Sequence, residues 1–320
     1  MKLLIAACLS IVYCLLFITT SALGLGEAPP KEPVPAPTIE LMAEFGRPGA
    51  SEGDFSSPLD VSVGIVGDLE TGLGSLFVAD TRNNRVVRLD EDGDFLFQFG
   101  RFGIDQGSFN SPAGIAVDFN SRIYVTEKDN DRVQLFDIHG NFVSEIATGE
   151  IKYKELNDPA GICVDSYGNI FVADSGNDRV IKFDDLGAYE ADFGAFGYGL
   201  GFFDNPMDVA VDRDNLIYVV DTNNHRVQVL DYDGQPLRSF GESGKGEGEF
   251  YLPQGIAVDD KLIYVADTGN NRVQVFDKDG KFLGLYDGFS APVGLCVGKS
   301  GQLFVADTGN QLIKELKISY

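Results

Sequence analysis

The stretch PQGIAVDDKLIYVADTGNNRVQVFDKDG, residues 253–280, decides the fold. It contains three short apolar segments, GIAVD, LIYVAD and RVQVFD, which are separated by residues that favour turns. A fourth segment, KFLGLYD at 281–287, follows the turn DKDG. Short apolar runs bounded by Asp, Asn and Gly are typical of strands joined by tight turns. The stretch therefore predicts one four-stranded antiparallel sheet.

The same pattern occurs six times along the chain. Its first strand begins at Pro58, Pro112, Pro159, Pro206, Pro253 and Pro292, with spacings of 54, 47, 47, 47 and 39 residues. GDLETGLGS at 67–75 lengthens the first unit and is interpreted as a loop insertion. One such sheet cannot bury both of its faces alone, whereas six sheets packed radially can. The repeats predict an all-β, six-bladed β-propeller.

The ends of the chain predict how the ring closes. The sixth unit stops at LIKELKISY, its third strand, and lacks a fourth. The segment TIELMAEFG at 38–46 is similar to the fourth strand of the first unit, DFLFQFG at 94–100. We expect an N-terminal strand, about residues 39–46, to complete the last blade and remove an open sheet edge. The propeller domain would then cover residues 39–320.

The repeated residues P-x-G-I-A-V-D and I-Y-V-A-D-T-x-N-x-R-V-Q-V-F-D-x-D-G closely resemble the NHL-repeat family. The resemblance covers about residues 39–320 and implies a six-bladed β-propeller. It implies no single function, because members of the family include interaction modules, sensor domains and a few lyases.

The first 26 residues are predicted to be a signal peptide or a signal-anchor. Lys2 precedes an uncharged run at 3–26, and Thr20-Ser21-Ala22 offers small residues for cleavage. Residues 27–38 are proline-rich and predict an extended spacer. We expect the body to be exported, in the periplasm, cell envelope or extracellular space, either released or tethered to a membrane through 3–26. The net charge of −24 argues against a nucleic-acid partner.

Each unit carries an acid at the end of its second strand, an asparagine three residues later and, in five units, an arginine five residues later. Because these residues recur in every blade, we interpret them as scaffold: the acid binds its own turn, the asparagine takes the left-handed conformation and the arginine pairs with the acid. Cys163 and Cys296 lie in blades three and six, on opposite sides of the ring. They are predicted to be buried free thiols that cannot form a disulfide.

The glycine-rich segment FGESGKGEGEF at 240–250 is a blade-to-blade connector and not a phosphate loop. A Walker loop needs G-x-x-x-x-G-K-[ST]. Here Gly246 follows Lys245, and the segments at 45–58, 99–112 and 193–206 share F-G-x-x-G-x-x-x-G-x-F-x-x-P without the lysine. The connector at 146–159, which contains Lys152 and Lys154, is irregular, and the connector at 286–292 is truncated. These two connectors are candidate places for a partner.

Residues that break the repeat on the face of the strand 2–3 loops and connectors are the candidate site. Asp60 and Asp208 replace glycine at the channel rim, on opposite sides of the ring, and could bind a cation or line a wet acidic pore. Arg82, Lys128 and His225 lie in the strand 2–3 loops. No catalytic residue and no cofactor is predicted, although calcium or zinc at Asp60 and Asp208 stays open.

The sequence therefore favours a non-catalytic, monomeric binding scaffold or sensor module. Its partner would be a protein, peptide or glycan on the strand 2–3 and inter-blade loop face. The alternative is a propeller enzyme of the lyase or lactonase type, with a divalent cation at the channel mouth.

Overall fold

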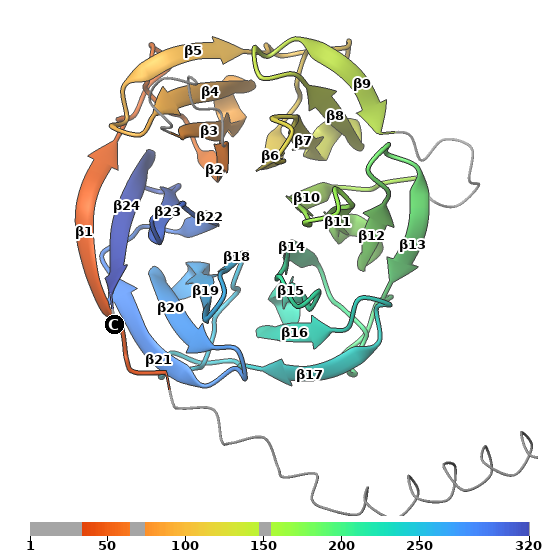
Figure 1. Ribbon diagram of the computed structural model, residues 1–320, viewed down its shortest axis with the longest axis vertical. Coiled ribbons are helices and arrows are strands. Elements are labelled where there is room, and N and C mark those ends of the chain that lie inside the picture. The colour runs from red at the N-terminus through yellow and green to blue at the C-terminus, as the bar shows by residue number, and fades with distance from the viewer. Residues whose placement is uncertain (1–33, 65–73, 147–154, 320) are drawn as a thin grey trace, which may run out of the picture. The chain divides into compact units, whose positions relative to one another are not determined.

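The computed structural model describes residues 34–64, 74–146 and 155–319. From Pro35 onward the chain forms one compact unit. Six four-stranded antiparallel sheets surround a central channel, as Figure 1 shows. The predicted all-β, six-bladed propeller is confirmed. Among the described residues no helix is long and apolar enough to cross a membrane. The predicted signal segment lies outside them.

Five blades are continuous in sequence and run from the channel outward. Blade one holds β2 (Pro58–Gly64), β3 (Ser75–Asp80), β4 (Arg85–Asp90) and β5 (Phe95–Phe99); blade two holds β6 (Pro112–Val117), β7 (Ile123–Glu127), β8 (Arg132–Phe136) and β9 (Phe142–Ile146); blade three holds β10 (Pro159–Val164), β11 (Ile170–Asp174), β12 (Arg179–Phe183) and β13 (Tyr189–Phe193); blade four holds β14 (Pro206–Val211), β15 (Ile217–Asp221), β16 (Arg226–Leu230) and β17 (Pro236–Phe240); blade five holds β18 (Gly255–Val258), β19 (Leu262–Asp267), β20 (Arg272–Asp277) and β21 (Phe282–Asp287).

Blade six joins the two ends of the propeller. It holds β22 (Pro292–Val297), β23 (Gln302–Asp307), β24 (Leu312–Ser319) and β1 (Thr38–Phe45). β1 pairs antiparallel with β24, from Thr38 opposite Ser319 to Phe45 opposite Ile313. The N-terminal strand therefore closes the ring, as predicted, and the chain's last strand is not left as a free edge.

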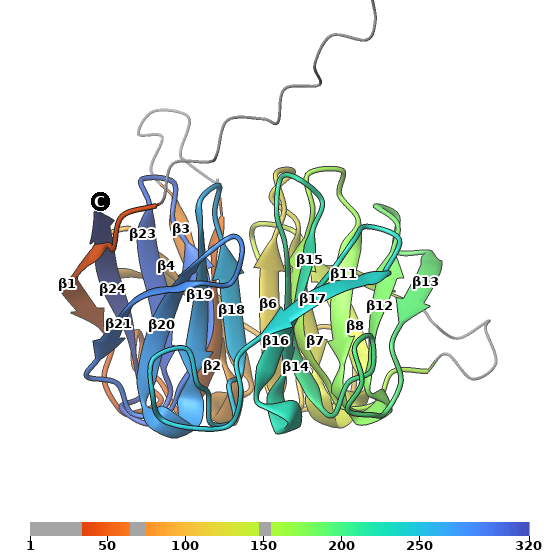
Figure 2. The same cartoon turned by 90° about the horizontal axis from the view of Figure 1, so that it is seen from below.

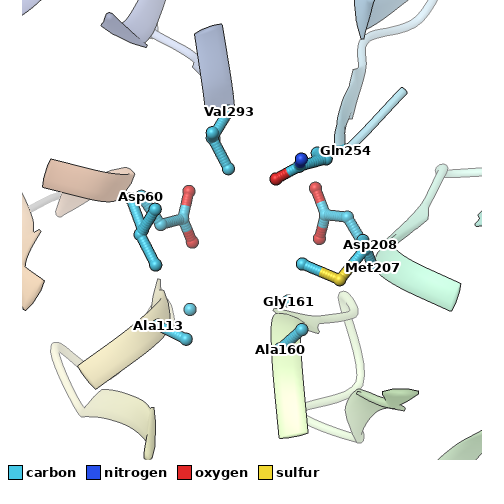
Figure 3. Close-up of a pocket in the computed structure, with 11 residues that line it drawn as sticks. Asp60, Ala113, Ala160, Gly161, Met207, Asp208, Gln254 and Val293 are labelled. Atoms are coloured by element: carbon cyan, nitrogen blue, oxygen red, sulfur yellow. The ribbon is translucent and has the colours of Figure 1, made fainter. Parts of the chain in front are cut away.

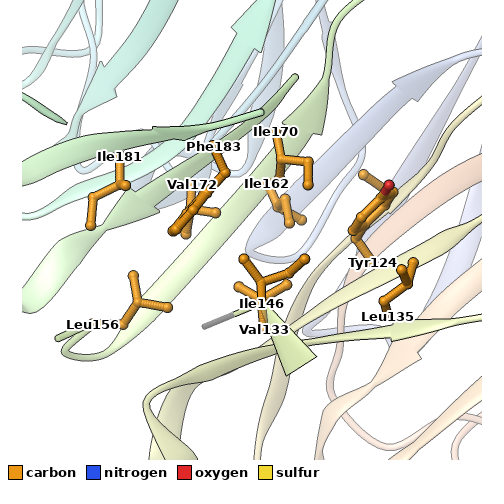
Figure 4. Packing of buried hydrophobic residues seen from close by; sticks show 11 residues of the cluster. Tyr124, Val133, Leu135, Ile146, Leu156, Ile162, Ile170, Val172, Ile181 and Phe183 are labelled. Atoms are coloured by element: carbon orange, nitrogen blue, oxygen red, sulfur yellow. The ribbon is translucent and has the colours of Figure 1, made fainter. Parts of the chain in front are cut away.

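The core lies between neighbouring blades, where flat sheets pack face to face. In one cluster, Tyr124 and Val133 of blade two meet Ile170 and Phe183 of blade three (Figure 4). Strands two and three of each blade are almost wholly buried, since both of their faces contact a neighbouring blade. This explains why strand two reads as a continuous apolar run, such as IFVAD or IYVVD, rather than an alternating one.

Strands run between two faces of the disc, as the side view in Figure 2 shows. One face carries the strand 2–3 loops and the connectors, and we call it the connector face. Its strand 2–3 loops contain short 3-10 helices in five blades: η1 (Thr81–Asn83), η2 (Lys128–Asn130), η3 (Ser175–Asn177), η4 (Thr222–Asn224) and η5 (Thr268–Asn270). The opposite face carries the strand 1–2 and strand 3–4 turns. The Asp-x-x-Gly turns after strand three end in left-handed glycines, such as Gly93 at φ 85° and Gly280 at φ 87°, as predicted.

Candidate functional site: the connector face and the channel mouth

The recurring acid, asparagine and arginine form one buried hydrogen-bond network in each of blades one to five. In blade five, Asp267 is fully buried and accepts hydrogen bonds from the backbone N–H of Tyr251 at 2.8 Å, Asn270 Nδ2 at 2.9 Å, Arg272 Nε at 2.7 Å and Gln274 Nε2 at 3.0 Å. Every blade with the arginine has the same ion pair to its acid, at 2.6–2.7 Å. The prediction that these residues are scaffold is confirmed. We call this set the acid–Asn–Arg network.

The network holds the connector that enters its own blade. The guanidinium of Arg272 donates to the carbonyls of Lys245, Gly246 and Glu249, at 2.9, 2.6 and 2.9 Å. The fork of Arg132 binds carbonyls of connector 99–112 in the same way. Sequence reasoning missed this role, because backbone carbonyls leave no side-chain signal. Lys245, which suggested a phosphate loop, contributes its carbonyl oxygen to this contact.

The glycines of the connector motif make room for buried side chains. The first glycine has φ of 83–91° in the four regular connectors, at Gly46, Gly100, Gly194 and Gly241. A Cβ on Gly241 would lie 2.3 Å from the ring of Phe250, which is fully buried. The motif therefore selects glycine for both its backbone conformation and this close approach.

The left-handed residue of the strand 2–3 loop is one position later than predicted. Asn83 has an ordinary conformation and donates to Asp80, whereas the next residue, Asn84, has φ 51°. The same fourth position is left-handed in the other blades, at Asp131, Asp178, His225, Asn271 and Gln311. In five blades its side chain accepts a hydrogen bond from a backbone N–H of the next connector.

His225 is a structural variant at this fourth position. Its Nδ1 accepts a hydrogen bond from the backbone N–H of Leu252 at 3.0 Å, and its ring stacks on Tyr251 at 5.6 Å and 12°. Asn271 makes the equivalent contact with the N–H of Ala291 at 2.8 Å. Because Nδ1 accepts, the neutral ring carries its proton on Nε2. The sequence named this histidine as a candidate site residue; in the structure it is half-buried and positions a connector.

Asp60 and Asp208 lie at the channel rim, and their carboxylates face one another across the pocket in Figure 3. Asp60 accepts the backbone N–H of Val61 and that of Ile115 in blade two, each at 2.8 Å. Asp208 accepts the N–H of Val209 and that of Ile256 in blade five, each at 2.8 Å. Each carboxylate therefore bridges two neighbouring blades. Sequence reasoning placed the pair correctly but did not foresee this bridging.

Burial raises the pKa values of both rim carboxyls. Desolvation raises the pKa of Asp208 to about 7, against the opposing effect of its two backbone N–H donors. The pKa of Asp60 is raised well above its usual range by desolvation and by the charge of Asp208. Two like charges that face a common pocket disfavour each other's ionised form. At neutral pH the pair therefore carries less than two negative charges.

The rest of the mouth is mostly apolar. One residue from each blade lines it, just before the rim position: Leu59, Ala113, Ala160, Met207, Gln254 and Val293. Within the described part of the chain, no three His, Cys, Asp or Glu side chains are grouped as metal ligands. The channel mouth is therefore small and weakly polar, and the two carboxyls that bridge neighbouring blades are its charged groups.

The two cysteines are free, as predicted, but they are not fully buried. Cys163 on β10 and Cys296 on β22 are partly buried and line the channel cavity of about 200 Å³. Each also packs against a hydrophobic cluster between its blade and a neighbouring blade, as the small side chains of strand one predicted. Desolvation raises the pKa of both thiols well above the usual value.

The remaining candidate residues do not converge on one site. Arg82 and Lys128 are exposed on η1 and η2, in neighbouring blades, while His225 belongs to blade four. Lys152 and Lys154 lie outside the described residues. Among the five candidates that the structure describes, it brings together Asp60 and Asp208 alone.

Four segments of the chain match the NHL repeat, at residues 156–183, 203–230, 250–276 and 289–316. They coincide with blades three to six. The chain belongs to the NHL-repeat family. This NHL-repeat chain is 34% identical over 107 residues to Protein brain tumor of Drosophila melanogaster, which is 33% of the chain and 10% of that protein. It is 38% identical over 74 residues to RING finger protein nhl-1 of Caenorhabditis elegans, or 23% of the chain and 7% of that protein. The match therefore spans a tenth or less of these relatives.

Solved structures of very different kinds share the NHL propeller's fold. A gluconolactonase from Xanthomonas campestris superposes with a TM-score of 0.62 at 19% identity, covering 89% of this chain and 99% of that chain. Virginiamycin B lyase from Staphylococcus aureus gives 0.58 at 12% identity, covering 88% and 99%. A chain of a nidogen/laminin complex gives 0.61 at 18%, covering 81% and 97%. At these identities the likeness shows the fold alone.

Proposed function

We propose that the protein is an exported or membrane-tethered NHL-repeat propeller without catalytic activity, and that it binds a protein partner on its connector face. The observation that carries the proposal is that the symmetry-breaking polar groups already have structural partners. Asp60 and Asp208 each accept two backbone N–H groups, and the Nδ1 of His225 accepts another. A catalytic acid or base must instead be free to contact a substrate.

Two further features support binding on this face. The acid–Asn–Arg networks fix the connectors from below, so their outward side chains are free to vary without loss of the fold. Those side chains differ strongly between connectors that have the same backbone. The uncharged run at 3–26, with Lys2 before it, supports export.

Site-specific photo-crosslinking of the full chain in its native cell tests the binding face. A photoreactive residue replaces Lys245 on the connector face or, as the matched control, Tyr167 on the opposite face; both positions are exposed. We expect discrete protein adducts from position 245 and none from 167. Adducts from position 167 alone would reject the proposed face. The mass of the mature chain, recovered from the envelope or secreted fraction, tests export and cleavage at Ala22.

Metal titration separates this function from the enzyme alternative. Calorimetric titration of the full chain with calcium or zinc chloride should give no stoichiometric binding at neutral pH. Stoichiometric binding that is lost when Asp60→Asn and Asp208→Asn are combined would favour the lyase or lactonase alternative instead.

A further inference from the structure

Four exposed apolar side chains stand on a single connector, 193–206. They are Phe196, Tyr198, Leu200 and Phe202, with 60%, 71%, 44% and 48% of their surface exposed. Large apolar side chains scattered singly on a surface need no explanation, but a group of them on one short loop does. We call these four residues the aromatic connector surface.

The fold of the connector does not require them. Connector 240–253 has the same length and carries Ser243, Lys245, Glu247 and Glu249 at the four equivalent positions. The backbone contacts of the two are alike: the N–H of Gly197 donates to the carbonyl of Phe203 at 2.9 Å, and that of Gly244 to Phe250 at 2.9 Å.

The arginine contacts are also alike in the two connectors. Arg226 binds the carbonyls of Gly199 and Phe202 at 2.8 and 3.1 Å. Arg272 binds those of Gly246 and Glu249 at 2.6 and 2.9 Å. The same connector backbone and the same arginine contacts therefore form with polar side chains at all four positions.

The apolar side chains pack on each other and not into the core. Phe196 and Tyr198 are in edge-to-face contact, with ring centroids 5.9 Å apart. Phe202 lies over Gly197, where an added Cβ would come within 3.0 Å of it. In connector 240–253, Glu249 occupies the place of Phe202 and accepts a hydrogen bond from the N–H of Gly246 at 2.8 Å. Phe202 makes no such bond, and 48% of its surface stays exposed.

Acidic residues outnumber basic residues next to this surface. Connector 193–206 contains one charged residue, Asp204, and no lysine or arginine. Asp178 contacts the same connector through the N–H of Asn205 at 2.7 Å. The following connector adds two exposed glutamates, Glu242 and Glu247, and one exposed lysine, Lys245. Aromatic faces beside carboxylates favour a ligand that combines apolar groups with positive charge, through cation–π and ionic contacts.

We propose that the aromatic connector surface is a binding site for a peptide segment, of a partner protein, that carries apolar and basic side chains. The inference rests on the proposed function and adds to it the residues and the chemistry of the partner. The aromatic rings would bury apolar side chains of the peptide, and the neighbouring carboxylates would select lysine or arginine.

Selection from a phage-displayed library of random peptides tests the proposal. The full chain is the bait, and a variant that combines Phe196→Ser, Tyr198→Lys, Leu200→Glu and Phe202→Glu is the comparison. These are the residues of connector 240–253, so the variant should keep the fold and the thermal midpoint. Its net charge is one unit more negative than that of the parent, so lost binding of a basic peptide cannot come from a loss of overall negative charge. The matched control, Leu96→Ser with Leu237→Ser, removes two exposed apolar side chains from outer strands β5 and β17.

We expect the enriched peptides to combine apolar and basic residues. Synthetic copies should bind the parent and the control with equal affinity, bind the four-site variant at least tenfold more weakly, and lose affinity from 50 to 500 mM NaCl. The reciprocal graft, Ser243→Phe, Lys245→Tyr, Glu247→Leu and Glu249→Phe, should create a second site.

Several results would overturn this inference. One is unchanged affinity for the four-site variant, and another is enrichment of peptides without basic residues. A third is that the four-site substitutions abolish self-association or adsorption to anionic phosphatidylglycerol vesicles while no peptide is enriched. If the four-site variant keeps its partner adducts from position 245, the inference fails and the proposed function stands. If position 245 gives no adducts at all, the proposed function fails with it.

Discussion

Replacing Arg272 by leucine should destabilise the propeller strongly. The change mimics blade six, where Leu312 occupies the arginine position. Arg272 is 6% exposed and pairs with Asp267, which is fully buried, at 2.7 Å. Removing one partner of a buried ion pair costs about 3–5 kcal/mol, because the other charge stays buried without compensation. Domains are stable by about 5–15 kcal/mol in total, so a large share would be lost.

The assay is urea unfolding followed by circular dichroism, with hydrogen exchange at the backbone N–H groups of connector 240–253. We expect faster exchange at Gly244 and Phe250, since their connector loses three carbonyl contacts. The control is Arg213→Leu. Arg213 pairs with Asp260 at 2.7 Å, but these side chains are 82% and 60% exposed. An exposed pair contributes about 0–1 kcal/mol.

An Arg272→Leu variant that loses no more stability than Arg213→Leu would refute the reasoning. The double variant Asp267→Asn with Arg272→Leu tests the cause. It should recover part of the lost stability, since the uncompensated charge is gone. Equal loss in the single and double variants would mean that the lost carbonyl contacts, and not the buried charge, account for the effect.

Three further predictions concern the channel and the connectors. The folded-state pKa of Asp208, about 7, lies above its usual value of 3.8, so the stability that its protonated form contributes is complete below about pH 4 and is lost as the pH rises through 7. The free energy of unfolding should therefore fall less between pH 5 and pH 8 in Asp208→Asn than in the parent. An unchanged fall would contradict the raised pKa. Cys163 and Cys296 should react slowly with iodoacetamide at pH 8 in the folded protein and rapidly in urea, because desolvation disfavours both thiolates. Mass spectrometry measures the labelling, and rapid labelling of the folded chain would show the prediction to be wrong. His225→Asn should keep the thermal midpoint, because Asn271 accepts the equivalent backbone N–H in blade five. His225→Ala should lose about 1 kcal/mol of unfolding free energy, because that hydrogen bond is lost. Equal midpoints for the two variants would exclude the structural role.

Most of the fold could be predicted because the same local pattern occurs in six repeats, and each repeat supports the same assignment of strands and turns. The starts of strand one, the closing strand β1 and the left-handed glycines of the strand 3–4 turns follow from apolar periodicity and turn chemistry. The predicted pairing of each arginine with its acid also depended on side chains alone. These features are visible in a sequence because each is specified by the residues that form it.

The parts that could not be predicted depend on contacts between distant backbone groups. Asn84 and Asn83 are both asparagine, so composition alone could not say which is left-handed. The partial exposure of Cys163 depends on where the strand faces the channel. Asp60 reaches the N–H of Ile115, 55 residues away, and nothing in either residue type signals that contact.

One signal for the acid–Asn–Arg network was nevertheless present in the sequence. Glutamine lies seven residues after the acid in blades two, four and five, and each of these has a regular connector. In each, the N–H of the connector's third glycine donates to this glutamine at 2.9 Å. Blade three has the irregular connector and Ile181 at this position, but the correlation is incomplete, because blade one has a regular connector and Val87.

Blade six lacks both the glutamine and the arginine. Its connector is truncated, and it carries Leu312 for arginine and Lys314 for glutamine. Lys314 Nζ pairs with Asp307 at 3.0 Å and donates to the carbonyl of Gly288. A guanidinium fork is suited to several carbonyls at once, whereas one ammonium suffices for a single carbonyl and a carboxylate.

Connectors with the same backbone and the same inward contacts can therefore carry different outward side chains. Connectors 193–206 and 240–253 have the same glutamine and the same arginine contacts, yet one presents Phe196 and Tyr198 where the other presents Ser243 and Lys245. Because the inward contacts are constant, the difference between the outward faces cannot be a requirement of folding. The difference is what selection for a binding partner on one connector would produce, and grafting one outward face onto the other tests that independence directly.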